Sequence, residues 1–144
     1  MKLQISTKVR YAARAMIELA LCYNNSEPVQ LNDIACKQDI SVKYLEQIMA
    51  PLRARGYVRT QKGSRGGYHL AVDPHKITLY DIVESVEGSI SPVICIDDQA
   101  CERWDKCVTR LVWQRVKDAM KYELQAKSLA DLAGEQGNLY LSQN

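Results

Sequence analysis

Three cysteines lie six residues apart in a short polar segment, CIDDQACERWDKC, at residues 95–107. On an α-helix, six residues turn a side chain by roughly 240° and advance it about 9 Å, so the thiols would not meet. On an extended strand they would share one face but lie roughly 20 Å apart. Only an irregular loop that folds back on itself brings Cys95, Cys101 and Cys107 together, as a metal centre would require. Three unconnected thiols are the alternative.

The composition is that of an ordinary globular protein. The chain has 144 residues, of which 47% are hydrophobic and 25% charged, enough for one domain with an added helical element. No run of about 18 apolar residues occurs, and Arg10, Arg14 and Glu18 interrupt the N-terminal apolar stretch, unlike a signal peptide. We therefore expect a cytoplasmic protein with no membrane partner, whose five cysteines stay reduced.

The charge is distributed unevenly along the chain. Up to Val72 there are eleven Lys and Arg against five Asp and Glu, a net charge of +6, whereas the rest of the chain carries −4. A basic first half predicts contact with a polyanion. The alternative is that these charges form an ordinary solvated surface.

The first half has the pattern of a helix-turn-helix. Apolar residues recur at helical spacing from about Thr7 to Tyr23, and again in LNDIACKQ at residues 31–38. Ser41 is a suitable N-cap for a third helix at residues 42–56. Two short helices across a tight turn, the second ending in basic residues, predict a DNA-binding helix-turn-helix. On this recognition helix we expect DNA contacts from Ser41, Lys43, Tyr44, Glu46 and Gln47.

A wing is predicted directly after this helix, at about residues 57–72. YVRT and YHLAV read as short strands, and the basic, glycine-rich QKGSRGG separates them. Lys62 and Arg65 would lie at the hairpin tip and reach phosphates or the minor groove. A nucleotide-binding loop is the alternative, but QKGSRGG matches neither the P-loop nor the dinucleotide pattern.

The second half predicts a linker and a dimerisation helix. A helix capped by Thr78 ends the DNA-binding domain at residues 1–87, and the cysteine loop follows at residues 88–107. From Val108 a broad apolar stripe continues to Leu124, and pairing with the same helix of a second subunit would bury it. Packing onto the N-terminal domain is the alternative. We expect a short terminal helix, capped by Ser128, up to residue 133 and a mobile tail at residues 134–144.

The predicted fold class is therefore mainly α: a winged helix-turn-helix domain with a small two-stranded wing, plus a long C-terminal dimerisation helix. A homodimer would read double-stranded DNA as a roughly palindromic operator. The sequence contains no arrangement of nucleophile and base that would indicate an enzyme. An electron-transfer iron–sulfur protein is the alternative of a different class, and the basic helix-turn-helix and wing argue against it.

The sequence resembles the family of bacterial winged-helix regulators that includes IscR, NsrR and CymR. The resemblance runs from about residue 2 to Ala133 and is carried by ISTKVRYAARAMIELA, SVKYLEQIMAPLRARGYV, GGYHL and DIVESVEGSISPV. The three-cysteine loop has the spacing of the iron–sulfur branch, whereas CymR-like members lack it and sense cysteine supply. The IscR-like resemblance implies a dimeric regulator of iron–sulfur cluster assembly genes that holds a cluster, 2Fe–2S in type, through Cys95, Cys101 and Cys107. NsrR-like members respond to nitric oxide and related ones to iron.

The fourth cluster ligand departs from the family pattern. The family's ligand positions hold Arg110 and Lys8 here, and an always-protonated guanidinium does not coordinate iron. Carboxylates near the cysteines are the candidates, namely Asp97, Asp98, Glu102 and Asp105. Zinc also suits three thiolates, although the C-x2-C pattern is absent, and inert thiols are the third reading. Cys22 and Cys36 are expected in the core.

Overall fold

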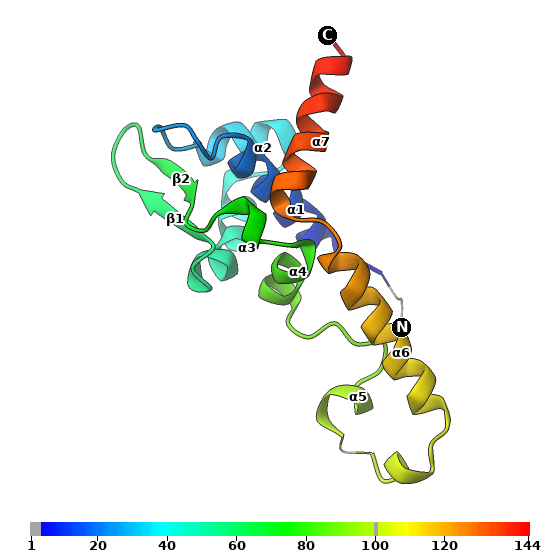
Figure 1. Cartoon of the computed structure of the whole chain (residues 1–144). Coiled ribbons are helices and arrows are strands. Elements are labelled where there is room, and N and C mark those ends of the chain that lie inside the picture. The colour runs from blue at the N-terminus through cyan, green and yellow to red at the C-terminus, as the bar shows by residue number, and fades with distance from the viewer. Residues whose placement is uncertain (1–3, 100) are drawn as a thin grey trace.

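The fold is mainly helical with one small sheet (Figure 1). The computed structural model describes residues 4–99 and 101–144. The elements are α1 (Thr7–Leu21), α2 (Leu31–Gln38), α3 (Val42–Ala54), β1 (Val58–Gln61), β2 (Gly67–Leu70), η1 (Pro74–Lys76), α4 (Leu79–Glu87), α5 (Cys95–Asp98), η2 (Trp104–Lys106), α6 (Thr109–Gln125) and α7 (Leu129–Ser142). The winged helix-turn-helix with a two-stranded wing is confirmed. None of the helices in the described ranges has the length and apolar character needed to cross a lipid bilayer.

Side-chain caps fix where the helices begin. The Ser41 hydroxyl accepts a hydrogen bond of 3.1 Å from a backbone N–H in the first turn of α3. Thr78 with Asp81, and Ser128 with Asp131, form reciprocal capping boxes at the starts of α4 and α7. All three caps agree with the sequence prediction.

The turn between α2 and α3 depends on a left-handed residue. Asp39 ends α2 with φ 55° and ψ 47°, a conformation that Asp tolerates better than most residues. The Ile40 N–H then donates to the Ala35 carbonyl at 3.1 Å. This tight turn places α3 across α2 and completes the predicted helix-turn-helix.

The core lies beneath α1, α2 and α3 and is closed by α7. Its largest fully buried side chains come from five helices and the η1–α4 connection: Met16, Leu19, Ile34, Leu45, Ile48, Met49, Leu52, Ile77, Ile82 and Leu129. The prediction of a short terminal helix was wrong, because α7 continues to Ser142 and packs on α1. Helix α7 runs through the segment expected as a tail because α1 offers it a surface, which sequence periodicity does not reveal.

The wing is anchored to the segment between α1 and α2. Val29 forms a bridge with Tyr68, with backbone hydrogen bonds of 2.9 and 2.8 Å. A Cβ atom at Gly67 would lie 2.3 Å from the Val29 carbonyl oxygen. Only glycine therefore lets the wing root approach this closely.

Helix α6 leads away from this core to the cysteine loop (Figure 1). Every residue of α6 is at least partly exposed. Its contacts within the chain include α4 on the core side and the short α5 in the loop. The loop thus lies at the far end of α6 from the wing.

Candidate nucleic-acid interface and cysteine loop

Helix α3 presents a polar face to solvent. Lys43, Glu46 and Gln47 are exposed and share this face because residues three and four apart are neighbours on a helix. Ser41 is exposed at the N-cap, whereas Tyr44 is half-buried. The opposite face of α3 lies in the core. This is the arrangement that a recognition helix requires.

Two residues of α1 join this face that sequence reasoning did not identify. The Tyr11 ring meets Tyr44 edge-on, with ring centroids 6.2 Å apart. The Arg14 guanidinium lies 5.6 Å from the Tyr11 centroid, and its Nη1 donates to Gln38 Oε1 at 3.3 Å. The i,i+3 spacing of Tyr11 and Arg14 was the available signal, but only the tertiary fold brings them beside α3.

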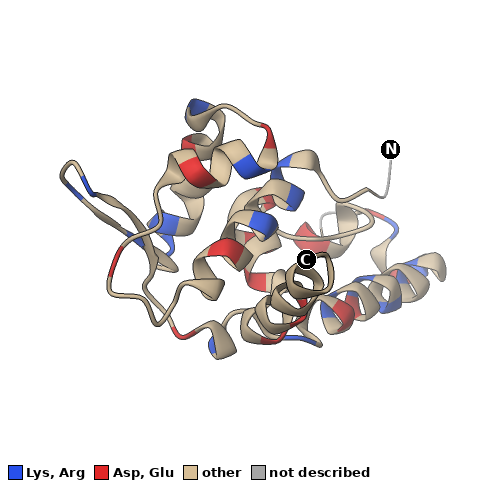
Figure 2. Ribbon diagram, turned by 90° about the horizontal axis from the view of Figure 1, so that it is seen from above, with Lys and Arg blue, Asp and Glu red and all other residues tan. Residues whose placement is uncertain are grey.

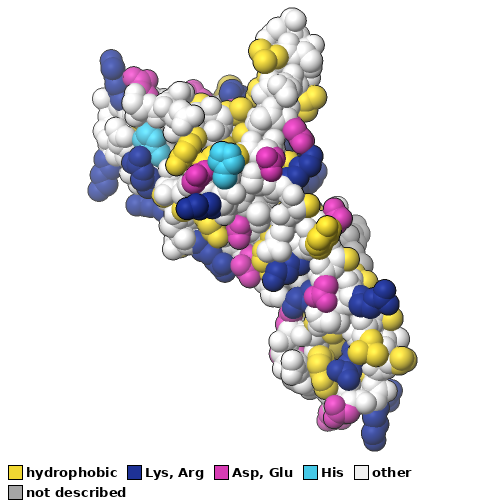
Figure 3. Space-filling model, viewed as in Figure 1, with side chains coloured by type: hydrophobic (Ala, Val, Ile, Leu, Met, Phe, Trp, Pro, Cys, Tyr) yellow, Lys and Arg dark blue, Asp and Glu magenta, His cyan; other side chains and the backbone are white. Residues whose placement is uncertain are grey.

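The wing carries positive charge and contains no acidic residue of its own. Lys62 and Arg65 are exposed between β1 and β2, and the sequence from Val58 to Ala71 contains no Asp or Glu. Figure 2 shows Lys and Arg along the wing. In Figure 3, Lys and Arg side chains gather at the wing end of the visible face. Charge of one sign on a projecting hairpin favours contact with phosphates.

Glu46 lies close to the wing root. Burial raises the pKa of the Tyr68 phenol, and the Glu46 carboxylate raises this pKa further. Glu46 on α3 is therefore within electrostatic reach of β2. A carboxylate at the junction of helix and wing repels phosphate, but it can accept a hydrogen bond from a cytosine amine.

The cysteine loop supplies three free thiols. Cys95 begins α5, Cys101 lies in an irregular segment and Cys107 follows η2; each is half-buried and unpaired. In residues 4–99 and 101–144, no group of three or more His, Cys, Asp or Glu is arranged to hold a metal ion. The donor chemistry fits three of the four ligands of an iron–sulfur cluster, whereas their convergence requires the loop to rearrange.

Cys107 has the environment of a thiolate ligand. Its Sγ lies 3.2 Å from the Thr109 hydroxyl. This hydrogen bond, with smaller contributions from the backbone and charge of Arg110, lowers the pKa of the Cys107 thiol. A lowered pKa favours the thiolate, which is the form that binds metals.

Two positions considered for the fourth ligand are already engaged. Arg110 stacks on Trp104, with its guanidinium carbon 4.6 Å from the ring centroid. Asp97 Oδ1 accepts hydrogen bonds from Lys117 Nζ at 2.6 Å and from Ser89 Oγ at 3.0 Å. Among the other positions, Lys8, Asp98, Glu102 and Asp105 are exposed.

The other two cysteines do not lie in the core, contrary to the prediction. Cys36 is exposed because the buried face of α2 consists of Leu31, Ile34 and Ala35. Cys22 is half-buried at the C-cap of α1. An apolar sequence neighbourhood did not fix the side of the helix on which each thiol lies.

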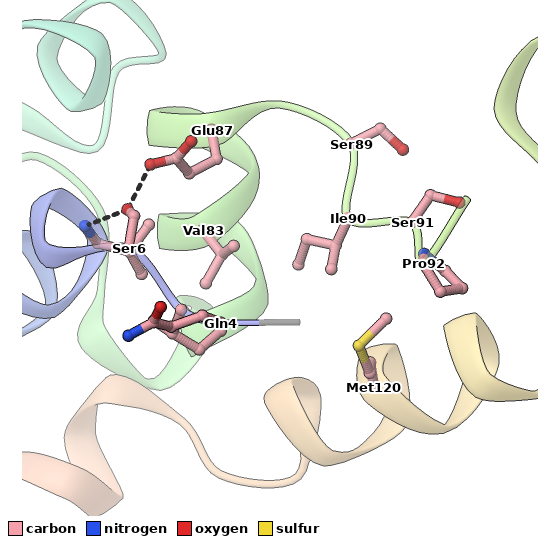
Figure 4. A pocket seen from close by; sticks show the side chains of 11 residues that line it. Gln4, Ser6, Val83, Glu87, Ser89, Ile90, Ser91, Pro92 and Met120 are labelled. Atoms are coloured by element: carbon pink, nitrogen blue, oxygen red, sulfur yellow. Dashed lines mark hydrogen bonds between the residues drawn. The ribbon is translucent and has the colours of Figure 1, made fainter. Parts of the chain in front are cut away.

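A cavity of about 290 Å³ lies where the cysteine loop leaves the DNA-binding domain (Figure 4). The start of α1, α4, residues 89–92 and Met120 of α6 all line it. The Ser6 hydroxyl donates a hydrogen bond to Glu87 at its edge. The first residues of the loop thus pack against both the DNA-binding domain and α6.

Comparisons with known proteins agree on one family. The family model Rrf2, described as an iron-dependent transcriptional regulator, matches residues 5–135. The transcriptional regulator CymR of Bacillus subtilis is 41% identical over 131 residues, covering 91% of this chain and 90% of CymR. The solved structure of CymR, the global cysteine regulator of B. subtilis, has a TM-score of 0.77 and covers 93% of this chain and 98% of that one.

The IscR of T. potens is similar as well. Its structure has a TM-score of 0.74 and 36% identity, and the match covers 94% of this chain and 90% of that chain. The match to the family model and these relatives span nearly the whole described fold, including the wing and α6. The chain therefore belongs to the Rrf2 family of transcription regulators.

Proposed function

We propose that this regulator senses iron–sulfur cluster status through Cys95, Cys101 and Cys107 and controls genes of iron–sulfur cluster assembly in the cytoplasm. The observation that carries the proposal is the position of three free thiols in the loop between the DNA-binding domain and α6. Thiolate–iron bonds would supply ordering energy to a polar segment that otherwise lacks it. The cluster is of 2Fe–2S type in this proposal, and its fourth ligand is open.

Homodimerisation through α6 is the second part of the proposal. Large apolar side chains of α6 face solvent, among them Leu111, Val112, Trp113 and Tyr122. Exposed apolar surface over α6 and the loop is also visible in Figure 3. A second copy of α6 would cover this stripe and place two α3–wing units on one face of a roughly palindromic duplex.

DNA contacts follow from the exposed polar face of α3 and from the wing. Ser41, Lys43, Tyr44, Glu46 and Gln47 would face the major groove, with Lys62 and Arg65 at the neighbouring phosphates or minor groove. Tyr11 and Arg14 join this surface as further candidates. Cluster binding would change sequence preference by altering how the two DNA-binding units sit.

A cysteine-responsive regulator is the second candidate, favoured by the 41% identity to CymR. The two candidates differ in what they require of the thiols. Anaerobic purification followed by iron and acid-labile sulfide assays and an absorption spectrum tests for the cluster. A random-duplex selection should then give different preferred sequences for loaded protein and for the triple Cys95→Ser, Cys101→Ser, Cys107→Ser variant. Identical preferences would leave these cysteines without a regulatory role.

A further inference from the structure

The helix that carries Cys95 contacts α6 and is joined to it by an ion pair. Ile96 of α5 is buried, and Lys117 Nζ lies 2.6 Å from Asp97 Oδ1. The Lys117 and Asp97 side chains are only 25% and 32% exposed, compared with 55% and 56% for the pair of Lys127 and Glu135 on the other side of the α6–α7 turn. The pair at α5 is therefore better shielded from solvent screening than an ordinary surface pair.

The same face of α6 also contacts the DNA-binding domain. Lys121 lies one turn after Lys117, and its Nζ is 5.2 Å from the centroid of the Tyr80 ring in α4. Met120 lines the cavity that Ser6 and the loop residues 89–92 also line (Figure 4). A displacement of α6 at Lys117 would therefore reach α4 and the start of α1.

We infer that Asp97 and Lys117 are positioning residues that couple the cysteine loop to α6, so that a change in the place of Cys95 alters the DNA-binding domain. The inference rests on the proposed function. It also assigns Asp97 a role other than fourth ligand, because one of its oxygens already accepts hydrogen bonds from both Lys117 and Ser89. Where convergence of the three thiols displaces α5, the ion pair carries that displacement to α6.

The test compares the DNA affinity of cluster-loaded and cluster-free protein for one duplex, selected from a random pool with loaded wild-type protein. Coupling is the ratio of the two Kd values. Lys117→Met removes the ammonium and keeps most of the side-chain length, and Lys127→Met is the matched control. In Lys117→Met the ratio should move toward one by about tenfold relative to wild type, while iron content, sulfide content and the absorption spectrum stay unchanged. Lys127→Met should keep the wild-type ratio.

Asp97→Asn tests the pair from its other end and provides a second variant should Lys117→Met fold poorly. It should also bring the ratio of Kd values toward one, with an unchanged absorption spectrum. Lys117→Arg keeps the positive charge and should keep the wild-type ratio. A wild-type ratio in Lys117→Met and Asp97→Asn would overturn the inference alone. A changed spectrum or lost iron in Asp97→Asn would make Asp97 a ligand and overturn it as well. Wild-type protein without a cluster, or with a ratio of one, would overturn the proposed function and this inference with it.

Discussion

The Tyr140 phenol of α7 donates a hydrogen bond of 2.6 Å to the carboxylate of Glu18 on α1. Glu18 is only 5% exposed, and Lys37 of α2 donates to its other oxygen at 2.9 Å. Three helices therefore meet at one buried carboxylate, which both partners satisfy. The contact joins the helix-turn-helix to the last helix of the structure.

Tyr140→Phe should lower the free energy of unfolding by about 1 kcal/mol at neutral pH, because it removes one donor to a buried acceptor. Glu18 raises the pKa of Tyr140 above its ordinary value of 10.0. The contribution is therefore fully present below that value and is lost as the pH rises through the raised folded-state pKa. Urea unfolding at neutral and strongly alkaline pH measures this. Tyr23→Phe, at a 42% exposed site outside α6, is the control; equal losses in both variants would contradict the prediction.

Gly67→Ala should destabilise the wing root. The added methyl would lie 2.3 Å from the Val29 carbonyl oxygen, so the bridge to Tyr68 would have to open at a cost of about 1–3 kcal/mol. The thermal unfolding temperature and the affinity for duplex DNA should both decline. Gly134→Ala is the control, since a Cβ there meets nothing within 4 Å in the helical α7, and it should stabilise by about 0.5–1 kcal/mol. Wild-type stability in Gly67→Ala would contradict the prediction, because it would show that the bridge between Val29 and Tyr68 rearranges without loss of stability.

Lys62→Ala and Arg65→Ala should weaken binding to most duplex sequences alike. Each lost phosphate contact should reduce the slope of log K against log salt by about 0.9. Binding titrations at several salt concentrations give this slope. Lys127→Ala is the control, because Lys127 lies between α6 and α7, far from the wing. This variant should keep the wild-type salt slope. Wild-type slopes in both wing variants would mean that the wing does not contact DNA.

Glu46→Ala should change sequence preference more than total affinity. Loss of a carboxylate that accepts from a cytosine amine changes discrimination at one base pair by about 1–3 kcal/mol. Selection from a random duplex pool shows the change as a relaxed position in each half-site. Asp33→Ala on α2 removes the same charge away from the exposed face of α3 and should keep the wild-type preference. Matching preferences for Glu46→Ala and wild type would remove Glu46 from readout.

Val112→Asp with Val116→Asp should convert the dimer to a monomer that binds DNA poorly. Val112 is 52% exposed, so the change adds charge to the stripe without unfolding the core. Gln114→Glu with Gln125→Glu places two charges on the opposite side of α6 and is the control. Sedimentation velocity measures the outcome. A dimer in the Asp variant would locate the interface elsewhere.

Local signals predicted the elements, and tertiary contacts decided what was missed. Ser41, Thr78 and Ser128 could be identified as caps because capping involves residues only three apart. Helix α7 was predicted too short because its glycines weaken helix propensity and its partner Glu18 lies far away in sequence. The convergence of the three cysteines stays a prediction, since the energy that would bring the thiols together comes from thiolate–iron bonds and not from contacts within the chain.

The place of Leu129 in the core has a consequence for how the protein folds. Its backbone N–H donates to the Ile77 carbonyl at 2.7 Å, and its side chain is fully buried among the residues of the helix-turn-helix. The cysteine loop and α6 are therefore inserted in the sequence between two parts of a single core, namely the elements up to α4 and helix α7. Contacts of such high sequence separation form slowly, because the intervening chain must first be closed into a loop. During synthesis, the core around the helix-turn-helix stays incomplete until α7 has been made. Cys95, Cys101 and Cys107 therefore leave the ribosome before Leu129 can complete that core.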